Sequence, residues 1–294
     1  MIEIKEKINL APYTSWLVGG PAEFLALPKS LDEIKEAQEW AQKRNLKVTV
    51  LGGGSNVLIA DQGIPGLVLV LKNFNGTQVM EEQGQLKITA LSGSSKSELL
   101  KIFLKAKLAP ALFLAGLPGD VGGGVVMNAG VGESFKPREF VEITDWVEVL
   151  KPDGKIQKYS QSEIQWTYRH SNGWQPGIIT AVGLKWPVQP DPTILDQVKQ
   201  ANKTRLSKQP LDMPSCGSVF VNPQGHKAAQ LIDSSHLKGF TIGGAQVSQK
   251  HANFIVNLGN ATASDILQVI EHVQKTVLAL KGVQLQTEVV RLGF

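Results

Sequence analysis

The sequence predicts an α+β fold in which two small mixed subdomains are followed by a separate α/β domain. Two observations support this prediction. Strand-like and helix-like segments alternate along the 294 residues, and three prolines occur within residues 187–192, which is typical of a linker. We therefore expect a first domain over residues 1–188, with subdomains at about 1–75 and 76–188, and a second domain over residues 193–294.

The first subdomain is expected to contain a short βαβ unit. Ser30 and Glu33 have the spacing of a capping box, and apolar residues recur at helical spacing after them. Strand-like runs follow at residues 48–51 and 67–71. The glycine-rich pentapeptide 52–56 then lies at the carboxyl end of the first of these strands.

The second subdomain is expected to combine one capped helix with four strands. Ser95 and Glu98 form a second capping box at the start of the helix. A turn of sequence Pro-Asp-Gly predicts a hairpin between two of the strands. A long glycine-rich loop separates the helix from that hairpin. The strands are expected at residues 86–91, 146–150, 156–159 and 178–186.

Beyond the proline-rich segment, short helices and strands alternate again. The helices are expected at residues 193–206, 225–234 and 265–280. The strands are expected at residues 219–221, 242–247, 253–257 and 283–290. This alternation predicts an α/β arrangement for the last third of the chain.

The run Ala115–Gly132 is the most informative segment for function. Seven of its 18 residues are glycine, and most of the others are small or aliphatic. Such a run offers backbone rather than side chains, because glycine permits φ > 0 and the close approach of another molecule. Successive exposed N–H groups bind phosphate oxygens. The alternative is a flexible surface loop, which fits poorly with the apolar residues inside the run.

A second glycine-rich run, residues 52–56, strengthens this interpretation. Two such runs suit the two phosphates of a dinucleotide. Neither run has the Rossmann spacing G-x-G-x-x-G, and neither is a Walker A motif. The sequence therefore favours a diphosphate-bearing cofactor that is held in a manner other than the Rossmann one.

Composition and charge exclude several classes of protein. No run of about 18 apolar residues predicts a transmembrane helix, and the first residues lack the apolar segment of a secretory signal. The single cysteine, Cys216, excludes an internal disulfide, so we expect a reducing cytoplasm. Residues 196–294 contain ten Lys and Arg against six Asp and Glu, which indicates an anionic ligand there. No nucleic-acid-binding motif is visible.

Several motifs, in order and spacing, resemble known flavoenzymes. One group resembles the FAD domain of the vanillyl-alcohol-oxidase (PCMH) type. Its members are Gly52–Asn56, Gly116–Gly119, Gly122-Gly123 and Met127–Gly130. The later motifs are similar to those of the UDP-N-acetylenolpyruvoylglucosamine reductase family. They occupy residues 168–171, 208–210, 214–220, 242–245, 251–257 and 288–289.

This resemblance implies a fold class and an activity. The fold would be a two-subdomain FAD-binding PCMH-type domain followed by a separate α/β substrate-binding domain. Such enzymes use NADPH to reduce FAD, which then reduces the enolpyruvyl ether of UDP-N-acetylglucosamine to UDP-N-acetylmuramate for peptidoglycan synthesis. We expect FAD to be non-covalent, because no histidine precedes His170 to tether it. The expected partners are NADPH and UDP-N-acetylglucosamine enolpyruvate, with no nucleic acid, no membrane, and a monomer or weak homo-oligomer in solution.

The resemblance also assigns roles to residues. Arg169, Ser218 and Glu288 match the three catalytic positions, and Lys208 and Tyr168 match substrate-binding positions. The cofactor-binding positions are Gly52, Gly53, Gly54, Ser55, Asn56, Gly116, Pro118, Gly119, Gly122, Gly123, Asn128, Ala129 and Gly130. No histidines pair at metal-ligand spacing, so we expect no metal.

The chemistry agrees with these residue types. Hydride addition to the β-carbon of an enolpyruvate places negative charge on the α-carbon and its carboxylate, which a guanidinium such as Arg169 can stabilise. Ser218 would donate the proton to the α-carbon. Glu288 is expected to be protonated in the complex with substrate, because a second carboxylate would repel the developing charge. Without the resemblance, we would interpret Arg169 as an ion-paired surface residue, Ser218 as a serine in a turn or at a strand end, and Glu288 as an exposed carboxylate at a strand end.

The sequence departs from the family pattern at three positions. Asp120 stands where Ser or Thr is usual, Gly124 where Ala is common, and Val221 where Lys or Arg is usual. An aspartate beside a diphosphate would repel it unless the side chain points away or pairs with a cation. The stretch from Ser218 to Glu288 is too short for the extra tyrosine-bearing loop of one subclass, so we expect the subclass without that loop.

Two other functions stay open at this stage. One is a different FAD oxidoreductase of the superfamily, acting on an alcohol or hydroxy acid with oxygen as acceptor. The other is a non-enzymatic anion-binding protein, which only the isoelectric point of about 9.0 suggests.

Overall fold

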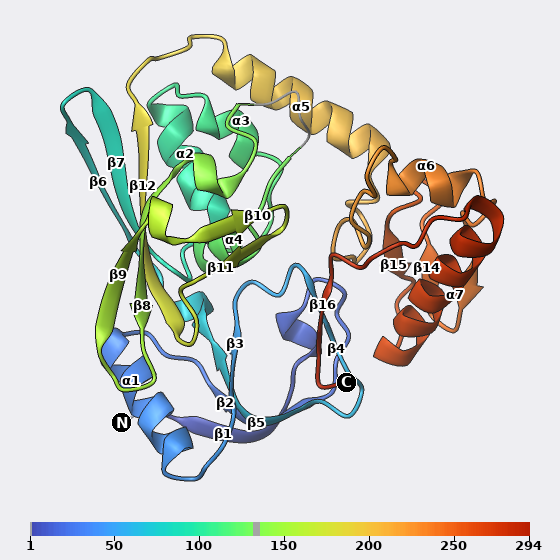
Figure 1. Ribbon diagram of the computed structural model, residues 1–294, viewed down its shortest axis with the longest axis horizontal. Helices are drawn as coiled ribbons and strands as arrows, with labels where there is room; N and C mark the ends of the chain where they lie inside the picture. The colour runs from blue at the N-terminus through green and yellow to red at the C-terminus, as the bar shows by residue number, and fades with distance from the viewer. Residues whose placement is uncertain (1, 132–135) are drawn as a thin grey trace. The chain divides into compact units, whose positions relative to one another are not determined.

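The computed structural model describes residues 2–131 and 136–294 and shows the mixed helix and strand architecture that the sequence predicts (Figure 1). Its contacts divide the chain into two compact units. Unit 1 contains Met1–Ile4, Ala26–Gly53 and Val68–Thr204, and unit 2 contains Lys5–Leu25, Gly54–Leu67 and Arg205–Phe294. Two early segments are thus grouped with the C-terminal third, whereas the sequence assigned them to the first domain. The domain boundaries at residues 188 and 193 stay a prediction.

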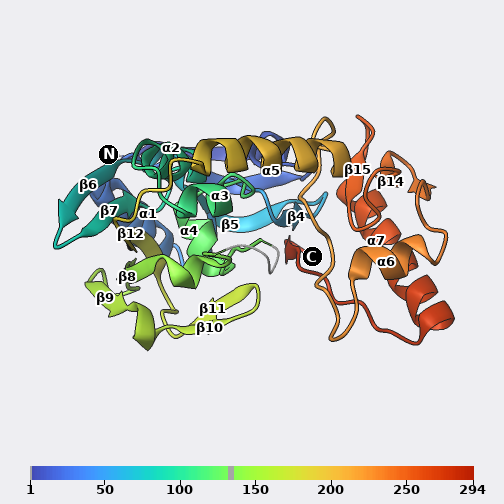
Figure 2. The same ribbon diagram turned by 90° about the horizontal axis from the view of Figure 1, so that it is seen from above.

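Unit 1 is built on an antiparallel five-stranded sheet of order β6-β7-β12-β8-β9. Its strands are β6 (Thr77–Glu82), β7 (Gln85–Leu91), β12 (Ile178–Pro187), β8 (Thr144–Leu150) and β9 (Ile156–Ser160). The four strands that the sequence predicted here are confirmed, and so is the hairpin of β8 and β9. The helices α2 (Lys96–Lys105), α3 (Pro110–Leu114) and α4 (Val121–Val126) gather beside this sheet (Figures 1 and 2).

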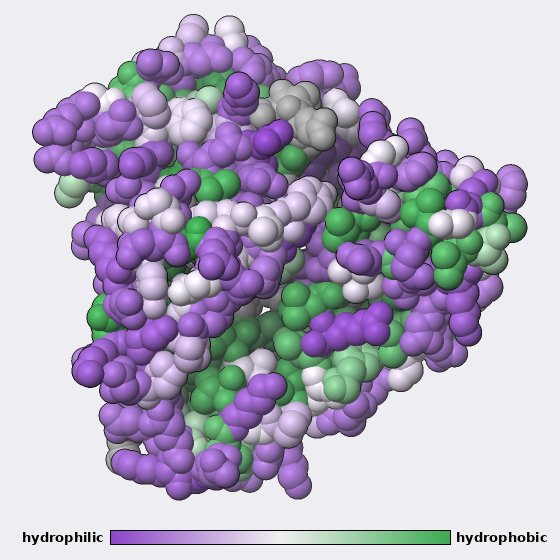
Figure 3. Space-filling view, in the orientation of Figure 1, coloured by the Kyte–Doolittle hydropathy of each residue, from purple (hydrophilic) through white to green (hydrophobic). Residues whose placement is uncertain are grey.

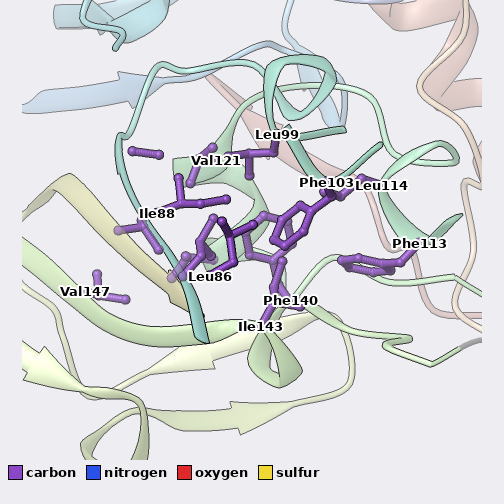
Figure 4. Close-up of a cluster of buried hydrophobic side chains, with 14 of the residues drawn as sticks. Leu86, Ile88, Leu99, Phe103, Phe113, Leu114, Val121, Phe140, Ile143 and Val147 are labelled. Carbon is purple, nitrogen blue, oxygen red and sulfur yellow. The ribbon is translucent and has the colours of Figure 1, made fainter. Parts of the chain in front are cut away.

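The core of unit 1 fills the space between the sheet and these helices (Figure 4). Phe103 of α2, Phe113 of α3 and Val121 of α4 are fully buried. The ring of Phe140 lies 6.0 Å from that of Phe113, centroid to centroid. Burying one such side chain contributes about 1.5–3 kcal/mol. This core therefore fixes the glycine-rich segment, because α4 lies inside that segment.

The strands near the amino terminus form a second sheet of order β1-β2-β5-β3. They are β1 (Ile4–Asn9), β2 (Pro21–Ala26), β5 (Ile64–Val70) and β3 (Val48–Leu51). The predicted helix is α1 (Leu31–Gln42), and Ser30 Oγ accepts a hydrogen bond from Glu33 N at 3.2 Å. Only half of the predicted capping box forms, because the carboxylate of Glu33 accepts from Lys29 N instead of Ser30 N.

The box predicted at Ser95 is likewise half formed. Ser95 Oγ accepts a hydrogen bond from Glu98 N at 3.2 Å, whereas the carboxylate of Glu98 accepts from Thr77 Oγ1 at 2.7 Å. In both cases the serine caps the helix as predicted, and the glutamate satisfies a different donor. The capping serines could therefore be predicted from local sequence, whereas the hydrogen-bond donors that the two glutamates pair with could not.

Unit 2 packs two helices around a small sheet. The strands β13 (Thr241–Ile242), β14 (Ala245–Val247) and β15 (Ile255–Asn257) are antiparallel, and β16 (Val290–Leu292) pairs in parallel with β4 (Val57–Ile59). The helices are α6 (Ala228–Asp233) and α7 (Ala263–Lys281), and Trp16 Nε1 donates to Ile255 O at 2.7 Å in the core. The helix that precedes this unit's core in sequence is α5 (Ile194–Lys208). All three predicted helices are confirmed.

Three strand predictions in unit 2 are wrong. The strand expected at residues 242–247 is instead a hairpin of β13 and β14, in which Ile242 pairs with Ala245. Residues 219–221 form only an isolated bridge, between Phe220 and Thr287, and the strand expected at 283–290 is replaced by the short β16. On one side of Phe220 the side chain of Asn253 accepts from Phe220 N at 2.9 Å and donates to Phe220 O at 2.8 Å. A side-chain amide thus takes the place of a neighbouring strand.

The surface is mostly hydrophilic on the face that Figure 3 shows, with hydrophobic side chains in smaller patches. Within the described residues, no helix combines the length and the apolar character that a membrane crossing requires.

Candidate cofactor and catalytic site

The two glycine-rich segments meet within unit 1. A Cβ atom on Gly53 would lie 2.9 Å from Gly119 Cα, and a Cβ atom on Gly52 would overlap Oδ2 of Asp120. Any larger residue at position 52 or 53 would therefore push the segments apart. The structure brings together the two runs that the sequence paired as a cradle. Close packing against backbone requires glycine at Gly53, and close packing against the side chain of Asp120 favours it at Gly52.

The segment predicted as a loop over residues 115–132 contains the helical turn α4, so that prediction is corrected. A Cβ atom on Gly122 would lie 3.0 Å from Ser92 Cβ, and one on Gly124 would lie 2.5 Å from the ring of Phe140. These glycines make room for tight packing. Each glycine destabilises a helix by about 1 kcal/mol relative to alanine, and for this reason the sequence predicted a loop here instead of a helix. The end of the run, Gly132, lies outside the described residues.

The first N–H groups of α4 already have acceptors within unit 1. Val121 N donates to Ser94 O at 2.9 Å, Gly122 N to Ser92 O at 2.8 Å, and Gly123 N to Asp120 Oδ1 at 2.7 Å. Since a saturated N–H cannot also serve a phosphate well, a cofactor would contact Gly122 and Gly123 through other atoms. Their assignment to the cofactor site stays a prediction.

Asp120 has a buried cationic neighbour, Lys96. Asp120 is 5% exposed and Lys96 is 4% exposed, and Lys96 Nζ donates to Pro118 O at 2.8 Å. Burial lowers the pKa of Lys96 to about 8, with the charge of Asp120 opposing this shift. Burial raises the pKa of Asp120, against the hydrogen bond from Gly123 N–H and the charge of Lys96. Asp120 is therefore a helix cap with a cationic neighbour, which resolves the conflict that the sequence posed.

Arg169 lies at the other end of the glycine-rich segment. It belongs to the two-residue turn between β10 (Gln165–Thr167) and β11 (His170–Asn172). Nη2 donates to Gly130 O at 3.1 Å, and Nη1 lies 3.7 Å from Oε1 of Glu139. The guanidinium also stacks over the half-exposed ring of Tyr168, at 4.5 Å from Cζ to the ring centroid.

The side chain of Asn128, a predicted cofactor ligand, is occupied by unit 1 itself. Nδ2 donates to Glu139 Oε2 at 3.1 Å and to Thr167 O at 3.0 Å, while Oδ1 accepts from Val141 N at 3.1 Å. The backbone of Ala129 pairs with Gly124 and Phe140. Asn128 therefore links the glycine-rich segment to the turn that contains Arg169.

Unit 2 brings the rest of the predicted cofactor segment to the predicted catalytic segment. Asn56 Nδ2 donates to Glu288 O at 3.0 Å, and Val290 N donates to Asn56 O at 3.0 Å. Glu288 N in turn donates to Val219 O at 2.8 Å, next to Ser218. Glu288 and Ser218 are both half-buried. The backbone thus connects Asn56, Glu288 and Ser218 in one local arrangement.

The neighbours of this arrangement are a turn and a buried thiol. Gly54 has φ +63°, and a Cβ atom there would overlap Tyr13 O. Burial and the charge of Glu288 raise the pKa of Cys216 well above its usual value, so the thiol stays protonated. Cys216 is buried, so a packed residue without chemistry of its own fits this position.

Two further predicted residues, Lys208 and Gly116, lie at or just after the ends of helices. Lys208 ends α5 with an exposed side chain, and Gly116 follows α3. Sequence reasoning missed Lys96 and Glu139. A lysine at the first position of α2 was a usable signal, because the positive end of the helix dipole disfavours a cation there. No pattern marked Glu139.

Comparisons with known proteins agree with this geometry. Residues 22–160 match the model of the FAD binding domain family, and residues 209–292 match that of the UDP-N-acetylenolpyruvoylglucosamine reductase C-terminal domain. The proteins named UDP-N-acetylenolpyruvoylglucosamine reductase from Synechococcus sp. (strain WH7803) and Limosilactobacillus fermentum are each 41% identical over 99% of this chain and are covered over 94% and 95% of their own lengths.

A solved structure extends the likeness to the fold. The crystal structure of UDP-N-acetylenolpyruvylglucosamine reductase from Thermus caldophilus superposes with a TM-score of 0.80 at 33% identity, over 99% of each chain. The predicted fold class, an FAD-binding domain followed by a C-terminal domain of this family, is thereby confirmed. The chain belongs to the UDP-N-acetylenolpyruvoylglucosamine reductase family, and it is an FAD-dependent oxidoreductase.

Proposed function

We propose that this chain reduces the enolpyruvyl ether of UDP-N-acetylglucosamine to UDP-N-acetylmuramate with NADPH as hydride donor, and that Arg169, Ser218 and Glu288 are its catalytic residues. Identity with reductases along the whole chain supports the reaction. One structural observation supports the site. The hydrogen bonds of Asn56 with Glu288 and Val290 join a predicted cofactor segment to a predicted catalytic segment.

The residues of the chain fit FAD. Positions 52–54 carry no side chains, and the space that a Cβ atom would need at each is filled by neighbouring backbone or by Asp120, so the bare main chain there is held in one conformation. This is the kind of surface against which a diphosphate can lie closely. FAD, once reduced by NADPH, supplies the hydride for the β-carbon of the substrate. We propose that it binds non-covalently, and that NADPH and the sugar nucleotide occupy the site in turn.

Arg169 has the properties that the developing carboxylate charge requires. A guanidinium is a permanent cation in proteins. It can donate two parallel hydrogen bonds to a carboxylate, which orients the substrate as well as stabilising it. The interaction strengthens as charge moves onto the carboxylate, so it lowers the barrier of the reductive step.

Ser218 supplies the proton that the α-carbon needs, and Glu288 supplies a further hydrogen bond. Ser218 donates a proton to the α-carbon, and its conjugate base must be stabilised by its surroundings, because serine is a weak acid. Glu288, in its protonated form, donates a hydrogen bond to the substrate carboxylate and so adds no negative charge beside it. The nearby thiol of Cys216 adds none either, since its pKa is raised.

The role of Glu288 is tested by two variants. Glu288→Gln is neutral, has nearly the same shape, and keeps a donor, so it should retain much more activity than Glu288→Ala. The measurement is the rate at which the sugar nucleotide reoxidises reduced enzyme. Equal and near-total losses in both variants would show that Glu288 acts as a base or an anion, and would remove this part of the proposal.

The overall reaction is tested by separating its two halves. NADPH should bleach the yellow enzyme under anaerobic conditions, and the enolpyruvyl sugar nucleotide should then restore the colour within the turnover time. Reoxidation by oxygen but not by the sugar nucleotide would favour the alternative, an oxidase acting on an alcohol or hydroxy acid. We further propose a cytoplasmic monomer or weak homo-oligomer, which sedimentation velocity across a range of protein concentrations tests.

A further inference from the structure

We propose that Glu139 is a positioning residue that holds the guanidinium of Arg169 in the orientation needed to meet a substrate carboxylate. The inference rests on the proposed function of Arg169 and adds a residue that the sequence did not single out. Glu139 would act through Arg169 and would not itself touch the substrate.

The backbone of Arg169 adopts an unfavourable conformation. Its φ of +58° lies in the left-handed region, which non-glycine residues rarely adopt and which costs an arginine roughly 1–2 kcal/mol. It occurs in a turn of only two residues, with Thr167 and His170 paired directly across the hairpin. Such a conformation persists where the surroundings fix it, and it points to a functional demand on the direction of the side chain.

Among the residues that the structure describes, three groups contact the guanidinium. Oε1 of Glu139 lies 3.7 Å from Nη1, the carbonyl oxygen of Gly130 accepts from Nη2 at 3.1 Å, and the ring of Tyr168 lies against one face. A Cβ atom on Gly130 would lie 2.7 Å from Nη1 and 3.0 Å from Glu139 Cγ. Glycine at position 130 is therefore needed to admit both members of the ion pair.

Glu139 is itself held in place. Its Oε2 accepts from Asn128 Nδ2 at 3.1 Å, and Asn128 is only 1% exposed. The backbones of Gly130 and Glu139 form an antiparallel bridge. The carboxylate thus has one oxygen toward a buried amide and the other toward Arg169. The contacts from Asn128 to Glu139 and from Glu139 to Arg169 therefore restrict the motion of the guanidinium relative to the segment that follows α4.

Energetics favour positioning over stability as the role of this pair. The side chains of Arg169 and Glu139 are 14% and 21% exposed, and a separation of 3.7 Å is long for a hydrogen bond, so the pair keeps some contact with water and adds little to stability. A bidentate contact with a carboxylate, however, needs the guanidinium plane in one orientation. Losing one of its fixed neighbours would leave the fold intact and the plane less well defined.

The test compares Glu139→Gln with a matched control, Glu142→Gln. Glu142 lies three residues further along and forms an ion pair with Arg138 at the same N–O distance, 3.7 Å, away from Arg169. In the FAD-loaded enzyme, NADPH should reduce both variants at the wild-type rate. Reoxidation by the sugar nucleotide should slow by between about tenfold and a hundredfold in Glu139→Gln, as for a slightly misplaced group, and should be unchanged in Glu142→Gln.

A second readout does not depend on turnover. In nitrogen-15 NMR of the holoenzyme, hindered rotation should give Arg169 two distinct Nη signals in the wild type and in Glu142→Gln. The two signals should merge in Glu139→Gln, and Arg169→Lys would identify them by their absence. Merged signals in the wild type would overturn the proposal, whatever the substrate proves to be.

The kinetic outcomes also separate the two hypotheses. Wild-type enzyme that NADPH reduces but the sugar nucleotide does not reoxidise would refute the proposed function alone, and the NMR experiment would still decide the role of Glu139. Equal slowing of both half-reactions in Glu139→Gln would indicate a structural role, and unchanged reoxidation would indicate no role. Either result would overturn the positioning proposal.

Discussion

Two cations of unit 1, Lys96 and Arg169, hold opposite ends of the same glycine-rich segment in different ways. Lys96 donates to the carbonyl of Pro118 and Arg169 to that of Gly130, and each has an acidic neighbour. Lys96 is almost completely buried, and its pKa falls to about 8. The guanidinium of Arg169 is more accessible and cannot lose its proton under physiological conditions.

This difference separates a structural cation, Lys96, from Arg169, for which we propose a catalytic role. A buried ammonium whose pKa lies near neutrality has a charge that depends on its surroundings, so it is a poor permanent partner for a substrate anion. A guanidinium keeps its charge and can give two directed hydrogen bonds. We therefore expect changes at Lys96 to appear in stability, and changes at Arg169 to appear in one half-reaction.

The largest expected effect follows replacement of the catalytic cation. Arg169→Lys keeps the positive charge but loses the bidentate geometry, so reoxidation of the reduced enzyme by the sugar nucleotide should fall by about 10²–10³-fold. Reduction by NADPH should stay within about twofold of wild type, since the carboxylate takes no part in it. Stopped-flow absorbance of the flavin measures both steps. The control, Arg138→Lys, changes an exposed arginine of the neighbouring segment. A similar loss in both half-reactions would contradict the assignment.

The next effect concerns the structural cation. Lys96→Met would leave the carboxylate of Asp120 without its counter-charge and the carbonyl of Pro118 without a donor. Breaking a buried pair in this way costs about 3 kcal/mol. The double variant Lys96→Met/Asp120→Asn should regain most of that loss. Urea midpoints measure these differences, with Lys101→Met, an exposed change on the same helix, as control. A stable single variant would show that the pair contributes nothing.

A smaller effect is the pH dependence of stability that Lys96 causes. Its pKa is about 8 in the folded chain, whereas the ordinary value for a lysine is 10.5, so the unfolded chain binds more protons between these values. The free energy of unfolding should therefore rise with pH across this window, by on the order of 2 kcal/mol relative to the double variant. Asp120, with its raised pKa, has the opposite sign in acid, because the folded chain then binds more protons. Urea midpoints at pH 7, 8.5 and 10, measured for the wild type and the double variant, test this pH dependence. If the midpoints of the two proteins changed with pH in parallel, the prediction would be refuted.

Local patterns predicted most of the elements, because strand alternation, helical spacing and capping serines are properties of short stretches. The helices α1, α2 and α7 and the strands β3, β7, β8, β9 and β12 appear near their expected places. The failures arose where distant residues decide. Asn253 takes the place of a strand beside Phe220, and the core at Phe140 makes a helix of a segment with three consecutive glycines.

The site was predictable to a similar extent. Both glycine-rich runs and the predicted catalytic positions were visible as motifs, and the structure joins Gly52 to Asp120 and Asn56 to Glu288. The partners Lys96 and Glu139 were not visible, because a charge pair is a contact in space and leaves no spacing in the sequence. Such partners also explain why Asp120, which departs from the family pattern, is compatible with its position.

The smallest expected effect concerns Asp120, which stands where the family usually has Ser or Thr. Asp120→Ser keeps an oxygen that can cap α4 and removes the negative charge, as does Asp120→Asn. If the carboxylate acts on the cofactor only through repulsion, both variants should bind FAD about three- to tenfold more tightly, because both remove the negative charge. Titration of apoprotein with FAD, followed by flavin fluorescence, measures the dissociation constant.

The opposite result would be equally informative. Weaker FAD binding in both variants would mean that the carboxylate holds Gly52 and the segment after Gly119 in their binding geometry, and that Lys96 has already neutralised its charge. The cap is common to Asp, Ser and Asn, so such a loss could not be assigned to the end of α4. It would place Lys96 and Asp120 alongside Arg169 and Glu139, as a charge pair that serves the ligand by holding the backbone around it.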